Sequence, residues 1–206
     1  MVTAPESVGR PKWPTDGGGV TDLLEELVRR AKTGDHDAFE SLVRPEIDRL
    51  YGLAGLLLSD RARAEDAVQE ALLRAWRDLP TLREAGRFGA WLRRLVVNAS
   101  HDEGRRIGRR RKEVELQPTH DPVSADETDR FMDRDELSRA FRRLKDEERT
   151  VLALRYFVDL TTADAAATLG IREVTYRSKL HRALRTLRAA LAADARAPAS
   201  PEGGWT

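Results

Sequence analysis

The chain has 206 residues, of which 40% are hydrophobic and 34% are charged, and its net charge is only +1. This length allows one or two small domains with modest cores. Because cysteine is absent, disulfides and thiolate zinc sites are excluded. No apolar run approaches the roughly 20 residues that span a bilayer and the N-terminus lacks an apolar signal segment, so we expect a cytoplasmic protein without membrane insertion.

Residues 1–20 contain three prolines and a run of three glycines, with almost nothing to bury. We expect a disordered tail. A glycine run can suggest a phosphate-binding loop, but no Gly-Lys-Ser/Thr follows this one and no strand precedes it.

The apolar spacing of residues 21–112 predicts a bundle of amphipathic helices with short connections. The first starts at Thr21 or Asp22, the second starts at Asp35 or Asp37, and the third covers roughly 62–79. Pro45 lies inside the second, where we expect it in an early turn or at a kink.

A fourth helix starts near Arg87 and joins an apolar face to a block of positive charge. Its apolar residues recur at three- and four-residue spacing: Phe88, Trp91, Leu92, Leu95, Val96 and Ala99. The opposite face carries Arg87, Arg94, Asn98, His101, Asp102 and Arg105. Counting Arg105, the segment 105–112 holds five arginines and one lysine: Arg105, Arg106, Arg109, Arg110, Arg111 and Lys112. Such a run is often only a solvated helix end, but clustered arginines gain most when phosphates neutralise them.

Residues 113–132 reverse this composition, with six acidic residues up to Asp129 and no lysine or arginine among them. Pro118 and Pro122 oppose regular structure, so we expect a flexible acidic linker. It is either a soluble tether or an acidic strand that occupies a basic channel built for nucleic acid.

Residues 133–193 predict a second helical domain that ends in a helix-turn-helix, and residues 194–206 predict a disordered tail. Ala166 is small enough for a close helix crossing, and Gly170 marks the turn. Tyr176 belongs to the inner stripe of the last helix. The exposed part of that helix carries Thr175, Arg177, Ser178, Lys179, His181 and Arg182, which suit DNA binding in the major groove. The fold class is therefore all-α, with two small helical domains.

No residue pattern supports an enzyme. The four histidines are far apart in the chain and show no metal-ligand spacing, so we expect surface histidines, no metal and no cofactor.

Together, the two halves resemble the extracytoplasmic-function (ECF) group of RNA polymerase sigma factors, the minimal kind with only sigma regions 2 and 4. The resemblance covers roughly residues 23–191. It is carried by the segment 64–70 (AEDAVQE), by Phe88, Trp91, Leu92, Arg94, Asn98, Asp102, Arg105 and Arg106, and by the stretch from Leu144 through Arg155-Tyr156-Phe157 to Leu184.

The resemblance implies a sigma factor that binds core RNA polymerase through its β′ clamp and β flap and directs it to promoter DNA. It implies polymerase binding by Asp66, Gln69 and Glu70. It implies recognition of the −10 element by Arg87, Trp91, Arg94, Asn98, Arg105 and Arg106, although the ring of Trp91 shares the apolar face. It implies recognition of the −35 element by Thr175, Arg177, Ser178, Lys179 and Arg182. An anti-sigma factor that hides both faces is also expected.

The chain departs from the usual family pattern in the turn, where Arg172 and Val174 replace a common proline and glycine and Tyr176 replaces a small aliphatic residue. Two alternatives remain at this point. A helix-turn-helix regulator would bind DNA without polymerase, and a decoy would bind polymerase without initiating transcription.

Overall fold

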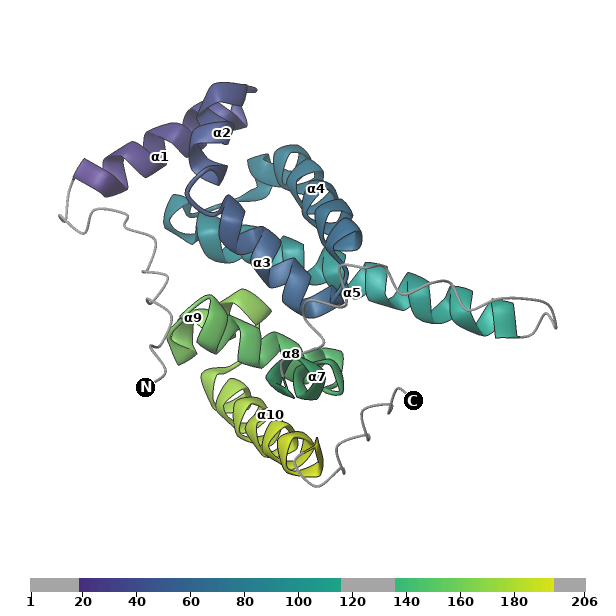
Figure 1. Cartoon of the computed structure of the whole chain (residues 1–206). Helices are drawn as coiled ribbons and strands as arrows, with labels where there is room; N and C mark the ends of the chain where they lie inside the picture. The colour runs from purple at the N-terminus through teal and green to yellow at the C-terminus, as the bar shows by residue number, and fades with distance from the viewer. Residues whose placement is uncertain (1–18, 116–135, 195–206) are drawn as a thin grey trace, which may run out of the picture.

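The computed structural model describes residues 19–115 and 136–194, and within these ranges it contains helices and no strand (Figure 1). The predicted tails lie outside this part of the chain, apart from a few residues at their inner ends, as does most of the predicted linker. The first domain comprises α1 (Gly19–Lys32), α2 (His36–Val43), α3 (Ile47–Leu58), α4 (Arg61–Asp78), the short helices η1 (Leu79–Thr81) and η2 (Ala85–Arg87), and α5 (Phe88–Glu115). The second comprises α7 (Glu136–Arg142), α8 (Asp146–Leu152), η3 (Ala153–Phe157), α9 (Thr162–Leu169) and α10 (Glu173–Asp194).

The expected second helix is two helices, which corrects the sequence prediction. Asp35 caps α2 by accepting a hydrogen bond from the backbone N–H of Ala38, and α2 ends at Val43. Proline lacks a backbone donor and its ring clashes with the preceding turn. Pro45 therefore separates α2 from α3 instead of lying within one helix.

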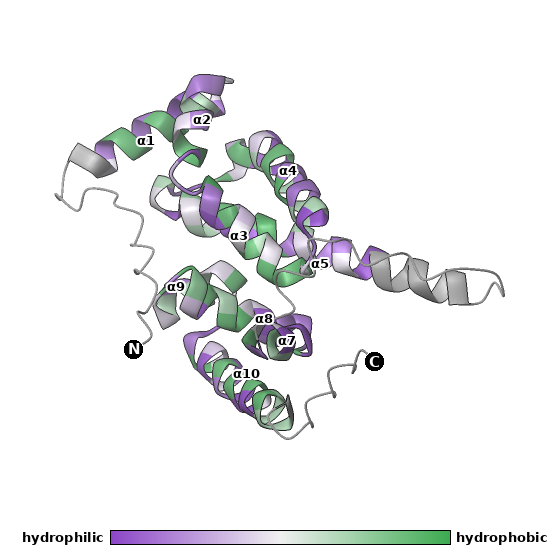
Figure 2. Ribbon diagram, in the orientation of Figure 1, coloured by the Kyte–Doolittle hydropathy of each residue, from purple (hydrophilic) through white to green (hydrophobic). Residues whose placement is uncertain are grey.

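The core of the first domain lies between α3, α4 and α5, where the hydrophobic sides of the ribbons face one another (Figure 2). Small residues on α4, such as Ala67 and Ala71, allow the helices to approach closely. The predicted apolar face of α5 is confirmed, because Phe88, Leu92 and Val96 are buried in this core. The buried apolar side chains of these three helices are Leu50, Leu53, Ala54, Leu57, Ala64, Ala67, Val68, Ala71, Ala75, Phe88, Leu92, Val96, Val97 and Ala99.

A buried ion pair ties the start of α3 to α5. Glu46 is 2% exposed and accepts a 2.9 Å hydrogen bond from Nη1 of Arg93, which is 9% exposed. Gly89 makes room for the pair, since a Cβ at that position would lie 3.2 Å from the Arg93 guanidinium. The pair fixes the end of the α2–α3 connection against the middle of the first domain.

The second domain is organised around α10, which packs against α7, α8 and α9. Tyr176 is fully buried, as predicted, and its hydroxyl donates a 2.7 Å hydrogen bond to the carbonyl of Val151 in α8. Burial raises the pKa of the Tyr176 hydroxyl. The tyrosine side chain therefore fits the inner stripe of α10, and its hydroxyl adds a hydrogen bond to α8.

The two domains also pack against each other, which the sequence did not predict. The ring of Phe157 at the end of η3 lies on Gly52 of α3, so closely that a Cβ at Gly52 would overlap it. Helix α9 lies beside α5, and apolar residues of both domains form one continuous core (Figure 1). We call this contact between α3, α5 and the α8–α9 region the domain seam.

Replacing Arg93 with Met should destabilise the first domain by about 3 kcal/mol, because it leaves the Glu46 carboxylate buried without its partner. Chemical denaturation of the full chain measures this loss. The matched control is Arg44→Met, which removes an exposed pair with Glu40 and should change the unfolding free energy by less than about 0.5 kcal/mol. Equal effects of both variants would contradict a structural role for the buried pair.

Candidate nucleic-acid interface

The start of α5 presents a line of polar and cationic side chains. Arg87, Arg94, Asn98 and Arg105 are exposed, and Trp91 is half-buried between them. Trp91, Arg94, Asn98 and Arg105 recur at spacings of three, four and seven residues and so share one face of α5, and Arg87, the last residue of η2, directly precedes this helix. We call these five residues the basic stripe.

The surroundings of the basic stripe differ along its length. Arg87 is paired with Glu84 and Arg105 with Asp102, both in exposed positions where an ion pair is weak. The ring of Trp91 packs against the ring of Phe88, with 6.1 Å between the two ring centroids, so part of the Trp91 side chain belongs to the core. Arg106 is exposed on a different side of α5 and pairs with Glu103. The structure thus brings together five of the six residues predicted to bind the −10 element and leaves Arg106 apart.

The same face of α5 also contributes to the domain seam, through Arg94 and His101. The guanidinium of Arg94 lies on Gly170, where a Cβ would come within 2.9 Å of Nη1. Further along, Nε2 of His101 lies 2.9 Å from Oγ1 of Thr150 in α8. Because the Thr150 hydroxyl already donates to the carbonyl of Asp146, it accepts from His101. Arg94 therefore belongs both to the basic stripe and to the seam.

His101 was expected at the surface, and that expectation is wrong. Burial in the seam lowers the pKa of its imidazole. The carboxylates of Asp146 and Glu147 act in the opposite direction, whereas Arg105 and Arg149 lower the pKa further. The sequence could not reveal this, because the group that covers His101 comes from the second domain.

Helix α4 carries the three residues predicted to bind polymerase on its outer side. Asp66, Gln69 and Glu70 are all exposed and share one face, as their spacing predicts. Glu70 accepts a 2.7 Å hydrogen bond from Arg74. Leu73 continues the same face and is 67% exposed, which sequence reasoning missed although it lies three residues after Glu70. We call Asp66, Gln69, Glu70 and Leu73 the α4 face.

The helix-turn-helix predicted in the second domain is confirmed as α9, a short turn and α10. Thr161 caps α9 by accepting a hydrogen bond from the backbone N–H of Asp164. Gly170 ends α9 with a φ of +65°, in the left-handed region where glycine is favoured. Ala166 is buried at the crossing, as expected. These residues set the angle at which α10 leaves the turn.

The outward side of α10 carries the residues predicted to bind the −35 element. Thr175, Arg177, Ser178 and Arg182 are exposed, and Arg177 is paired with Glu173 one turn earlier. Lys179 lies on the flank of the helix, with its side chain 31% exposed. The structure therefore places these five side chains on the same helix, with Lys179 least available to a partner.

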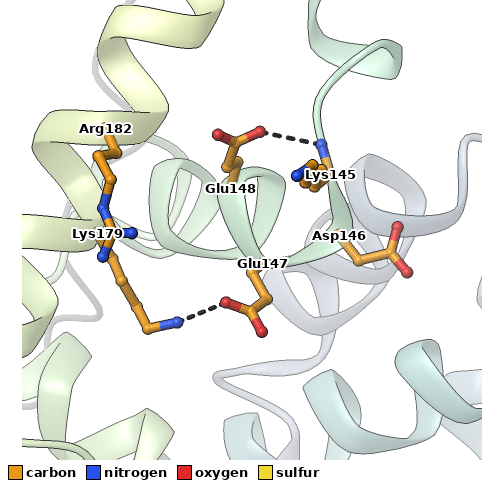
Figure 3. A pocket seen from close by; sticks show the side chains of 6 residues that line it. All are labelled: Lys145, Asp146, Glu147, Glu148, Lys179 and Arg182. Carbon is orange, nitrogen blue, oxygen red and sulfur yellow. Dashed lines mark hydrogen bonds and ion pairs between the residues drawn. The ribbon is translucent and has the colours of Figure 1, made fainter.

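Lys179 is held by the acidic first turn of α8. Its ammonium donates to Glu147 across a hollow, where Figure 3 shows Arg182 beside Lys179. The hydrogen bond from Lys179 holds the pKa of the Glu147 carboxyl below its ordinary value. A DNA phosphate would have to compete with Glu147 for this lysine.

Among the residues that the structure describes, no group of three or more histidine, aspartate or glutamate side chains is placed to hold a metal ion. Within the same ranges, none of the helices has the length and apolar character needed to cross a membrane.

Comparison with protein families gives two matches that together cover most of the described chain. Residues 42–110 match the family model of Sigma-70 region 2. Residues 134–187 match that of Sigma-70 region 4. The basic stripe and the α4 face lie in the first match, and the helix-turn-helix lies in the second.

Characterised relatives match across both regions. The RNA polymerase sigma-E factor of Streptomyces coelicolor is 34% identical over 162 residues, which cover 77% of this chain and 90% of the relative. The ECF RNA polymerase sigma factor SigL of Mycobacterium tuberculosis is 38% identical over 146 residues, which cover 69% of this chain and 82% of the relative.

Solved structures share the fold. CnrH in complex with the cytosolic domain of CnrY has a TM-score of 0.62 at 24% identity and covers 84% of this chain and 99% of CnrH. RpoE of Bartonella quintana, in complex with the anti-sigma factor NepR, has a TM-score of 0.59 at 24% identity and covers 76% of this chain and 98% of RpoE.

Replacing Gly52 with Leu should separate the domains, because the new side chain would occupy the space that the ring of Phe157 fills. Small-angle X-ray scattering should show a larger radius of gyration. Gly55→Leu is the matched control on the same helix, since nothing lies within 4 Å of a Cβ at that position. Both substitutions replace glycine with a better helix former. An equal increase in the radius of gyration of both variants would therefore argue against disruption of the domain seam as the cause.

The domain seam should also weaken as the pH falls. His101 has a lower pKa when packed than when exposed, where its ordinary value is 6.5. Between these two pKa values the separated domains bind more protons, so acidification favours separation, and the packed form keeps its full advantage above pH 6.5. Scattering profiles between about pH 7.5 and 5.5 should show expansion. A His101→Gln variant should lose that pH dependence; if it expands as the original does, other groups are responsible.

Proposed function

The chain belongs to the ECF RNA polymerase sigma factors and is thus a sigma factor that directs promoter-specific initiation by RNA polymerase, and we propose that three of its surfaces divide this work. The α4 face binds core polymerase, the basic stripe of α5 binds the −10 element, and the outward side of α10 binds the −35 element. The observation that carries the proposal is that all three surfaces are exposed on separate helices of one chain.

The α4 face suits a protein partner. It combines two carboxylates and an amide with the apolar side chain of Leu73. Protein interfaces commonly place such an apolar contact among charged groups that set orientation. An arginine-rich helical surface on polymerase, of the kind the family resemblance implies in the β′ clamp, would complement it.

The basic stripe suits single-stranded or melting DNA. Arg87, Arg94 and Arg105 can neutralise phosphates, Asn98 can hydrogen-bond a base edge, and the partly exposed ring of Trp91 can contact a base. The carboxylate partners of Arg87 and Arg105 are exposed and weakly held, so phosphates can replace them.

The helix-turn-helix suits double-stranded DNA. Its second helix has an exposed N-terminal half, with Thr175, Ser178 and Arg182 pointing away from the domain core. A helix in this position fits the major groove and reads base edges from its first turns. Arg177 and Lys179 on the flanks are placed for phosphates.

Reading both promoter elements requires the domain seam to open. The −35 and −10 elements are named by their positions, which are about 25 base pairs apart. At 3.4 Å per base pair this separation is roughly 85 Å along B-DNA. In the packed arrangement Arg94 touches Gly170, and Val174 is only four residues further on, at most about 14 Å of extended chain. The packed arrangement therefore cannot serve both elements at once.

An anti-sigma factor is the further partner that we propose. The two solved relatives are complexes, one with the cytosolic domain of CnrY and one with the anti-sigma factor NepR. A partner that binds both domains of this chain while they are packed would keep its DNA-binding surfaces apart from promoters.

The test of the proposed function is run-off transcription with purified core polymerase and a library of genomic promoters, with and without the protein. Specific transcripts that require the protein are expected, and their upstream sequences give the two elements. Core binding without transcripts would instead indicate a decoy, and DNA binding without core binding would indicate a simple regulator.

Replacing Asp66 with Lys should weaken binding to core polymerase at least about tenfold, because it reverses a charge on the α4 face. Fluorescence anisotropy of the labelled chain with core polymerase measures this. Glu25→Lys makes the same charge change at an exposed position of α1 and serves as the control. The assignment of the α4 face fails if both variants bind core polymerase equally well.

A further inference from the structure

Val174 is the most exposed of the large apolar side chains in the described part of the chain, at 72%. It is the second residue of α10, in the turn that enters the major groove in a helix-turn-helix. A single exposed apolar residue is ordinary on a protein surface. Its position at the front of the proposed recognition helix is what calls for an explanation.

Val174 begins a row along the centre of the outward side of α10. Ser178 and Arg182 follow at four and eight residues, and all three are exposed. At 1.5 Å per residue the row is about 12 Å long, enough for three or four base pairs. Tyr176 and Ala183, which are fully buried, lie on the opposite side of the helix. The row therefore points away from the domain.

The polar neighbours on either side are already restrained by carboxylates. Glu173 holds Arg177 on one flank, and Glu147 holds Lys179 on the other. The hydroxyl of Ser178 donates a 3.0 Å hydrogen bond to the carbonyl of Val174 itself. Nothing in this arrangement covers the valine methyl groups, so they remain available to DNA.

The chemistry of valine limits what it can recognise. It has no donor or acceptor, so it cannot bind a phosphate or the polar edge of a base. The apolar group that the major groove displays is the 5-methyl of thymine. We propose that Val174 is a specificity-determining residue that contacts the 5-methyl group of one thymine in the −35 element. This inference rests on the proposed function of α10.

The proposal is tested with the full chain, core polymerase and a promoter obtained from the run-off experiment. Each thymine of its −35 element is replaced singly by deoxyuridine, which removes only the 5-methyl group. Holoenzyme affinity is then measured for the original chain and for Val174→Ala. Alanine is a better helix former than valine, so this variant is not expected to lose its fold.

One thymine should respond in a coupled way. Its replacement should weaken binding by the original chain about fourfold, which corresponds to about 0.8 kcal/mol for one buried methyl group. The same replacement should leave Val174→Ala nearly unaffected. Leu23→Ala, which truncates an exposed apolar residue on α1, is the control and should behave like the original chain.

Three results would overturn the proposal: a −35 element without thymine, no effect of any deoxyuridine, or equal effects on the original chain and Val174→Ala. In all three cases promoter-dependent transcription is normal, so the proposed function stands while the role of Val174 does not. Failure of the proposed function looks different, because no transcript would then depend on the protein at all.

Discussion

The packing of α5 on two sides is the constraint on which the rest of the structure depends. One side, with Leu92 and Val96, is buried against α3 and α4 and makes the first domain. A second side, with Arg94 and His101, meets the second domain. The basic stripe shares this second side, because Arg94 belongs both to the stripe and to the seam. The same helix therefore holds the core, the domain seam and the proposed −10 surface in fixed relation.

Many arginines in the described part of the chain are paired with exposed carboxylates, such as Arg87 with Glu84 and Arg105 with Asp102, in a chain whose net charge is only +1. Exposed pairs such as Arg87 with Glu84 contribute at most about 1 kcal/mol each, so they do not hold the arginines tightly. DNA offers many phosphates at once and gains from the release of counterions. The buried pair of Glu46 and Arg93 is of another kind, because its groups cannot reach solvent and it serves the fold.

The parts of the fold that sequence reasoning predicted are those in which each helix packs within its own domain. The inner face of α5, the helix-turn-helix and the buried Tyr176 all follow from three- and four-residue spacing. Pro45 predicts an interruption, but the apolar spacing alone does not distinguish a kinked helix from two separate helices. The burial of His101 depends on Thr150, 49 residues away in the chain, and no local pattern contains that information. Leu73 and Val174 are exposed although apolar, and apolar character alone predicts burial for both.

The domain seam and the promoter surfaces compete for the same residues, and this links the fold to the proposed function. Arg94 can rest on Gly170 or reach a phosphate, but one guanidinium in one rotamer does not do both. Binding of DNA to the basic stripe therefore favours separation of the domains, and separation in turn frees α10 to reach a distant element. By thermodynamic linkage, a partner that binds only the packed domains lowers the affinity for promoter DNA, and promoter DNA lowers the affinity for that partner by the same factor. The seam would thus couple the two proposed DNA-binding surfaces without a direct contact between the promoter elements.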